Sequence, residues 1–211
     1  MKRVIFIDWN RTLSFDLFWG HLKDGRHPNH HHLAPIEEWL FVKNRELIYP
    51  WMRGDISVED IIERMSNDTK IPAKIILQEL RHSCEIMQYC IVGLEGLVGD
   101  IQARGVKVVI ATDNMDTFSR FTVPALKIDQ LFDAYLNSYD MKHLKDDEEP
   151  ADRIVFFDDF LAKNNLTYAD VVLLDDSPDR SGKYQRLGFE RIVIDSPERL
   201  RKVLEDYAYG S

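Results

Sequence analysis

The segment VIFIDWNRTL (residues 4–13) joins a short, uniformly apolar run to a polar turn. Three further segments have similar runs: VKVVIA (residues 106–111), which Thr112 follows, VVLLD (residues 171–175) and RIVID (residues 191–195). Strands that are buried on both faces of a parallel sheet have such continuous apolar runs, whereas half-exposed strands alternate apolar and polar residues. We therefore predict a parallel sheet that contains these segments.

Three of the apolar runs end at side chains that could bind a phosphate group or a metal ion. Asp8 ends the first run, Thr112 follows the second, and Asp175 ends the third, with Asp176 beside it. Ligands of an open parallel sheet bind outside the carboxyl ends of its strands. These residues would therefore form a compact anionic pocket. Asp195 ends the fourth run, but the Ser-Pro pair after it favours the start of a helix instead.

The overall composition limits the classes of partner. The chain has 211 residues and a formal net charge of −9, which disfavours a nucleic-acid binder that neutralises phosphates. It contains no apolar run as long as a membrane helix, and no secretory signal precedes the first predicted strand. Cys84 and Cys90 match no zinc or redox spacing. We therefore expect a cytoplasmic protein with reduced thiols and with no nucleic-acid or membrane partner.

A long segment separates the first predicted strand from the second, which begins near Val106. A single crossover helix could not fill this gap, and the segment has apolar residues at helical spacing. We therefore predict an all-helical cap at residues 15–91. It would be inserted into a core made of residues 1–14 and 92–211.

Local signals in this insert also favour helices. The stretch APIEEWLFVKNRELIYPWM (residues 34–52) has apolar residues, Val42 among them, near helical spacing. Ser57 is a predicted N-cap with Asp60 at the capping-box position. Pro72 is expected in the first turn of the next helix.

The segment IVFFDDFLAKNN (residues 154–165) has two possible structures. It could be a strand that ends at Asp158, or a helix with Phe157 and Leu161 on one face. We favour the helix because apolar residues continue past the acids. Strands alternate with helices in the rest of the core, which predicts an α/β fold with a doubly wound, Rossmann-like parallel sheet.

The motif DWNRTL (residues 8–13) resembles the nucleophile motif D-x-D-x-T-L of phosphatases in the haloacid dehalogenase-like (HAD) hydrolase superfamily. Thr112 matches the second motif of that family, residues 138–145 have the S-x(6)-K spacing of the third, and residues 174–177 match its acidic fourth motif. The motifs occur in the family's order over nearly the whole chain. The predicted insert also resembles the family's helical-cap subclass.

This resemblance implies a metal-dependent hydrolase, most directly a phosphatase that acts on a small phosphorylated metabolite. Asp8 would be the nucleophile and would form an aspartyl-phosphate. Mg²⁺ would bind to the carboxylates of Asp8 and Asp175 and to the main-chain carbonyl of Asn10. Asp176 would be a weaker metal ligand or an ordinary acid of the turn.

The resemblance also implies which groups bind the phosphate. The Thr112 hydroxyl and the amides near Thr112 and Asp113 would hold the phosphoryl oxygens, and Lys145 would neutralise charge. Asp113 could instead belong to an ordinary loop. Lys142 is the alternative lysine if the register of its loop differs.

Asn10 departs from the family's pattern. The phosphatases have an aspartate there, which is a general acid and base, whereas an amide cannot exchange a proton near neutral pH. Losing such a group costs about 10²–10⁴-fold in rate. Asp16, Asp113 or a cap residue could carry the proton instead. We favour a hydrolase; the alternative is a catalytically impaired protein that binds a phosphorylated ligand or a protein partner.

Three other features have ordinary interpretations. Arg11 occupies the position of a glycine in the family, so it would bind phosphate or point to solvent. His27 and the histidines at residues 30–32 lack the spacing of a zinc motif, and we expect them in a solvated loop of the cap. We expect the acidic run at residues 146–152 to be a solvated surface.

Overall fold

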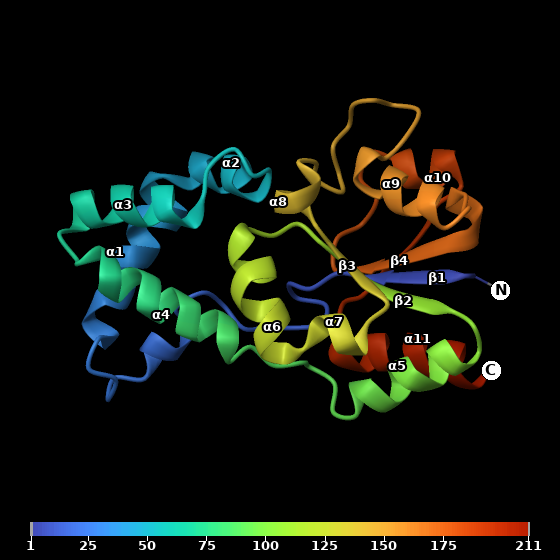
Figure 1. Ribbon diagram of the computed structural model, residues 1–211, viewed down its shortest axis with the longest axis horizontal. Coiled ribbons are helices and arrows are strands. Elements are labelled where there is room, and N and C mark those ends of the chain that lie inside the picture. The colour runs from blue at the N-terminus through green and yellow to red at the C-terminus, as the bar shows by residue number, and fades with distance from the viewer. Residues whose placement is uncertain (1, 211) are drawn as a thin grey trace.

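The computed structural model describes residues 2–210 and has a central sheet with helices on both faces (Figure 1). Within these residues the sheet has five parallel strands in the order β3-β2-β1-β4-β5. The strands are β1 (Val4–Ile7), β2 (Lys107–Thr112), β3 (Ala134–Asn137), β4 (Val171–Asp175) and β5 (Glu190–Val193). The predicted α/β fold with a parallel, Rossmann-like sheet is confirmed.

Strand β1 lies between β2 and β4 in the sheet. Ile7 of β1 pairs with Ile110 of β2 and with Leu174 of β4. All four residues of β1 and all five residues of β4 are buried, as the continuous apolar runs predict. The three central strands therefore end at nearly the same level, at one edge of the sheet.

Helices cover the two faces of the sheet. On one face, α5 (Leu94–Ala103) and α11 (Pro197–Tyr209) share a hydrophobic cluster with Ile5 and Ile7 of β1. On the other face, α9 (Val155–Lys163) and α10 (Lys183–Leu187) share a second cluster with Phe6. Figure 1 shows α9 and α10 above the sheet and α5 and α11 below it. The helix predicted in residues 154–165 is thus confirmed as α9.

Short helices and turns complete the part of the chain around the sheet. They are a π-helix (Phe118–Thr122), α6 (Val123–Leu126), α7 (Ile128–Leu131), α8 (Ser138–Met141) and a 3₁₀ turn (Tyr168–Asp170). As predicted, a helix follows the Ser-Pro pair after Asp195, because the Ser196 hydroxyl caps the N-terminus of α11. None of the helices described in residues 2–210 is both long and apolar enough to cross a membrane.

The chain between β1 and α5 is mainly helical and has its own hydrophobic cluster, to which Trp19, Trp39 and Trp51 belong. Its helices are α1 (Leu33–Glu37), α2 (Ile48–Met52), α3 (Val58–Thr69) and α4 (Ala73–Glu85). Its other turns are 3₁₀ at Gly20–Lys23, His30–His32 and Arg45–Leu47, and π-helical at Glu38–Lys43. The boundaries of the cap, at residues 15 and 91, remain predictions.

Two local predictions for this region were inaccurate. Residues 34–52 form several short helices, because a π-helical turn follows α1 and the backbone leaves the helical conformation at Asn44. The wider turn shifts the helical register, and Val42 is 73% exposed. Pro72 is the residue before α4 and not part of its first turn. The capping box of Ser57 and Asp60 is confirmed at the start of α3.

Polar contacts join the helical region to the loop that follows β3. Arg53, next to α2, forms a two-pronged ion pair with Asp147, with Nη1 and Oδ2 2.8 Å apart. The Lys142 amine donates a hydrogen bond of 3.0 Å to the carbonyl of Gly54. These contacts fix the end of α2 close to the segment that contains Lys145.

Candidate active site

The sheet brings three of the predicted site residues to one edge. Asp8 directly follows β1, Thr112 is the last residue of β2, and Asp175 is the last residue of β4. The backbone N–H of Asp8 still donates a hydrogen bond of 2.9 Å to Leu174 of β4. The backbone that carries Asp8 is therefore held against β4 beyond the end of its own strand.

The carboxylates of Asp8, Asp175 and Asp176 converge at this edge. One oxygen from each lies within 4.8 Å of the others. The side chains of Asp8 and Asp175 are 8% and 3% exposed, whereas Asp176 is half-buried. Clustered carboxylate oxygens are the ligands that Mg²⁺ prefers.

Lys145 is the lysine that reaches the carboxylates. Its Nζ atom lies 2.7 Å from Asp8 Oδ1 and 2.6 Å from Asp175 Oδ2, and its side chain is only 5% exposed. The Tyr184 hydroxyl donates a hydrogen bond of 2.8 Å to the Lys145 carbonyl and so helps to fix the loop. Lys142 instead lies over the ring of Tyr139 and contacts the helical region. The sequence spacing allowed either lysine near the carboxylates, and in the structure Lys145 lies there whereas Lys142 does not.

One cation in the site, Arg191 of β5, was not predicted from the sequence. Its guanidinium bonds to Asp175 Oδ1 at 2.8 Å and to Asp146 Oδ1 at 2.6 Å, and its side chain is 3% exposed. The guanidinium also lies over the ring of Tyr184. Asp146 thus forms an ion pair with Arg191 and Asp147 one with Arg53. The prediction of a solvated acidic run is wrong at Asp147, which is 16% exposed, whereas Asp146 is 53% exposed although it forms an ion pair.

Burial and neighbouring charges give the acids different pKa values. Burial, with the charge of Asp175, raises the pKa of Asp8 to about 7 despite the opposing effect of Lys145. Burial also acts to raise the pKa of Asp175, but Lys145 and Arg191 outweigh it and hold that pKa below its usual value. For Lys145, burial would lower the pKa, but the surrounding carboxylates raise it above the usual value. Asp175 and Lys145 are therefore both charged at neutral pH.

A cavity of about 180 Å³ opens onto these groups. Asn10, Arg11 and Asp113 line it together with the residues already described. Arg11 has a backbone φ of 60°, the left-handed conformation that glycine adopts without strain. The exposed side chain of Arg11 therefore borders the cavity from a turn in which a glycine would fit more easily.

Asp113 lines the cavity directly after Thr112, the last residue of β2. The Thr112 hydroxyl is buried and has no hydrogen-bond partner within residues 2–210. Asp113 accepts a hydrogen bond from the backbone N–H of Lys145, and burial raises its pKa to about 6. An unpaired buried hydroxyl usually has a partner that the polypeptide does not supply.

Asp16, the other predicted proton carrier outside the motifs, lies elsewhere. Its carboxylate accepts a hydrogen bond from the backbone N–H of Gln88, and it lines a different cavity. The strand-end cavity has no lining residue from 15–91. Asp16 and Asp8 thus line different cavities, whereas Asp113 and Asp8 line the same one.

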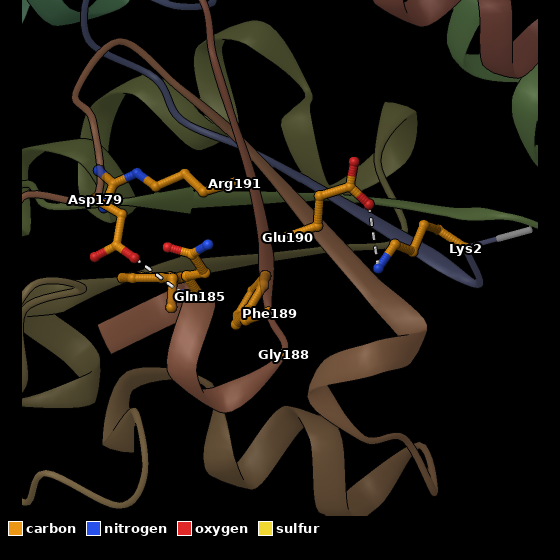
Figure 2. A pocket seen from close by; sticks show the side chains of 8 residues that line it. Lys2, Asp179, Gln185, Gly188, Phe189, Glu190 and Arg191 are labelled. Carbon is orange, nitrogen blue, oxygen red and sulfur yellow. Dashed lines mark hydrogen bonds and ion pairs between the residues drawn. The ribbon is translucent and has the colours of Figure 1, made fainter. Parts of the chain in front are cut away.

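A larger cavity of about 530 Å³ lies beside β5 but has a different character (Figure 2). Lys2 and Glu190 form an ion pair across it at 3.3 Å, and Asp179 accepts a hydrogen bond from the backbone of Gln185. Arg191 also lines it, but its guanidinium bonds to the acids of the strand-end cavity. The polar groups of this cavity are largely paired with one another, so we place the active site at the strand ends.

The fold is similar to that of solved HAD-like hydrolases. A predicted HAD-like family hydrolase from Porphyromonas gingivalis matches with a TM-score of 0.67 at 19% identity, over 100% of both chains. L-2-haloacid dehalogenase from Xanthobacter autotrophicus, with chloropropionic acid covalently bound, matches with a TM-score of 0.60 at 12% identity, over 98% of this chain and 83% of that chain.

A HAD family enzyme from Bacteroides thetaiotaomicron also matches, with a TM-score of 0.61 at 14% identity, over 92% of this chain and 94% of that chain. That protein was solved in complex with magnesium and inorganic phosphate. No family model and no curated protein matches this sequence. At these identities the similarity shows a common fold.

Proposed function

We propose that this chain is a metal-dependent hydrolase of the HAD superfamily that removes phosphate from a small phosphorylated metabolite. The observation that carries this proposal is the convergence of Asp8 and Asp175, at the ends of adjacent strands, with the amine of Lys145. The fold that the chain shares with HAD-like hydrolases supports it.

In this proposal Asp8 attacks the phosphorus atom and forms an aspartyl-phosphate while the bond from phosphorus to the metabolite's oxygen breaks and the metabolite leaves as an alcohol. Water then attacks the aspartyl-phosphate, which releases inorganic phosphate and regenerates Asp8. Lys145, already 2.7 Å from Asp8, neutralises charge on the phosphoryl oxygens. The unpaired hydroxyl of Thr112 donates a hydrogen bond to one of these oxygens. Arg11 borders the cavity and adds a positive charge at its entrance.

Mg²⁺ would be held by the carboxylates of Asp8, Asp175 and Asp176, with the carbonyl of Asn10. The donor set fits this ion because it consists of oxygen atoms that already converge. Bound Mg²⁺ would neutralise charge on the transferring phosphoryl group. Asp175 also accepts hydrogen bonds from Lys145 and Arg191, which would orient its carboxylate.

Asp113 is our candidate for the proton transfer that Asn10 cannot perform. It lines the same cavity as Asp8, and burial raises its pKa to about 6, close to the value that suits a general acid and base near neutral pH. Asp16 lines a different cavity.

We further propose that residues 15–91 form a cap that selects the substrate, and that the protein works in the cytoplasm. The separate hydrophobic cluster of the helical region supports the first statement. The free thiols of Cys84 and Cys90 are consistent with the second.

A panel of phosphorylated metabolites, assayed for phosphate release with and without Mg²⁺, tests the hydrolase. Asp8→Asn and Asp175→Asn should each lower the rate by at least about 10³-fold. Asn10→Asp should raise it by about 10²-fold or more, because it restores a proton carrier next to Asp8. Equally slow turnover by the wild type and Asp8→Asn would reject catalysis at this site.

A second candidate is a protein that binds a phosphorylated ligand or a protein partner without turnover. Asn10 favours it, because the motif then lacks its acid. Calorimetry with inorganic phosphate and Mg²⁺ should then show binding in the wild type, with no product from any substrate. Absence of both binding and turnover would reject its ligand-binding form.

A further inference from the structure

The helical region contains a second group of metal-binding side chains, outside the strand-end cavity. His21 Nε2 lies 2.7 Å from Glu79 Oε2, and His27 Nε2 lies 3.8 Å from the same oxygen. One donor atom from each of the three residues lies within 4.8 Å of the others. We propose that His21, His27 and Glu79 bind a zinc-class transition-metal ion.

The charge of Glu79 is the first argument. Its side chain, in the middle of α4, is only 9% exposed, and its hydrogen bonds come from His21 and Asn29. No lysine or arginine within residues 2–210 forms a salt bridge with it. A buried carboxylate needs a compensating positive charge. A divalent cation supplies that charge while the neighbouring imidazoles remain neutral.

The crowding of the histidines is the second argument. The ring of His21 packs edge-on against His27, with centroids 5.3 Å apart, and against His82, with centroids 4.8 Å apart. Imidazole nitrogens are good ligands for zinc. His21 Nδ1 is also buried without a hydrogen-bond partner in residues 2–210. This group of histidines therefore brings several nitrogen ligands within reach of one metal ion.

The ligand positions are nearly suitable for a tetrahedral ion. Zinc bonds of about 2.0–2.1 Å place tetrahedral ligand atoms about 3.3 Å apart, between the distances of 2.7 and 3.8 Å that Glu79 makes with the two histidines. Asn29 fixes Glu79 by a hydrogen bond of 2.7 Å to Oε1. The Asn29 backbone also donates to His27 Nδ1. A metal at His27 Nε2 would place the imidazole proton on Nδ1. Nδ1 could then no longer accept the hydrogen bond from the Asn29 backbone, so metal binding would break this bond.

A cavity of about 470 Å³ borders the cluster and leaves room for a water molecule as a further ligand. His27, Glu79 and His82 are among the residues that line it. The ion would link the turn that contains His21 to α4, two segments far apart in the sequence. Since the folded chain presents these ligands together, metal binding should also stabilise it.

Calorimetry with Zn²⁺ on the metal-free full-length chain tests the proposal, with excess Mg²⁺ present to occupy the strand-end carboxylates. The wild type should bind one Zn²⁺ ion. His27→Ala and Glu79→Gln should each weaken binding at least about tenfold. The matched control is the double variant His30→Ala/His31→Ala, which removes exposed histidines of the same segment and should bind as the wild type does.

Two outcomes overturn the proposal. One is unchanged Zn²⁺ affinity in His27→Ala and Glu79→Gln. The other is loss of binding in the His30/His31 control, which would assign the ion to exposed imidazoles. If circular dichroism shows that a variant misfolds, Co²⁺ bound to the wild type gives a separate test. An intense visible spectrum of a four- or five-coordinate ion is expected, and a weak octahedral spectrum contradicts the proposal.

Discussion

The protein contains two buried carboxylate clusters that balance their charge by different means. At the strand ends, Asp8 and Asp175 are paired with Lys145 and Arg191, whose charge does not change near neutral pH. In the helical region, Glu79 has only imidazoles and an amide as partners.

Because of this difference, a bound metal ion would have a different effect on charge in each cluster. The strand-end acids are already paired with permanent cations, so an ion there would add less to the compensation of their charge. The Glu79 cluster lacks a permanent cation, so an ion there would supply missing charge. We therefore expect the first cluster to bind its ion more weakly and exchangeably, and the second to gain more stability from its ion. The following variants test this contrast.

The largest effect is expected for Lys145→Met. It leaves the carboxylates of Asp8 and Asp175 buried without the cation that joins them, so the free energy of unfolding in urea should fall by about 3–5 kcal/mol. Lys142→Met is the matched control and should change it by less than about 0.5 kcal/mol, because Lys142 is exposed. Equal losses in the two variants would contradict the role of Lys145 as the neutralising group.

Glu79→Gln should have a smaller, pH-dependent effect in chelator-treated protein. Burial acts to raise the pKa of Glu79, but hydrogen bonds from His21 and Asn29 outweigh it and lower the pKa below 4.5. An acid whose pKa is lower in the folded state than in the unfolded state stabilises the fold. This stabilisation is complete above the pKa of the unfolded state and is lost as the pH falls through the pKa of the folded state.

We therefore expect Glu79→Gln to lower the free energy of unfolding by about 1.5–3 kcal/mol at pH 7, and the difference from wild type to shrink as the pH falls below about 4.5. Urea titrations at a series of pH values measure this. Glu85→Gln, in a half-exposed pair with Arg81 on the same helix, should change stability by about 0–1 kcal/mol at pH 7. A pH-independent loss in Glu79→Gln would argue against a charged Glu79.

The contrast between the clusters also shows what the sequence could reveal. The proximity of Asp8 and Asp175 was predictable, because adjacent parallel strands that end at the same edge of a sheet bring the ends of separate apolar runs together. Arg191 was not, because a strand sequence does not show which neighbouring side chains a cation will meet. His21 and Glu79 belong to a turn and a helix whose relative position depends on tertiary packing. His27 and the histidines at residues 30–32 were all expected in a solvated loop, but His27 lies close to His21 and Glu79, partners that no local spacing reveals.

Helix caps in the two regions should show whether the regions unfold separately. Ser57→Ala removes the cap of α3, and Ser196→Ala removes that of α11, each at a cost of about 1 kcal/mol. Tryptophan fluorescence reports mainly on the helical region, which contains Trp19, Trp39 and Trp51. We expect Ser57→Ala to shift the fluorescence transition in urea more than Ser196→Ala does. Identical shifts would mean that residues 15–91 do not unfold as a unit of their own.

Arg11→Gly should give the smallest effect. A left-handed backbone costs a non-glycine residue about 1–2 kcal/mol, and the greater freedom of glycine in the unfolded chain offsets about 0.5–1 kcal/mol of the gain. We expect a net stabilisation below about 1 kcal/mol in urea unfolding. Arg11→Ala is the control, because it removes the charge but keeps the strain, and it should not be stabilised. A gain in both variants would attribute the effect to charge.

The ion pair between Arg53 and Asp147 places a mechanical constraint on the loop that contains Lys145. Asp147 lies two residues after Lys145 in the same loop, and Arg53 directly follows α2. Any hinge motion that lifts α2 away from the sheet must either break this pair or pull on the lysine loop. Under the proposed function, the entry of a substrate and the position of the Lys145 amine next to Asp8 are therefore linked, so that a wider opening would hold this amine less firmly.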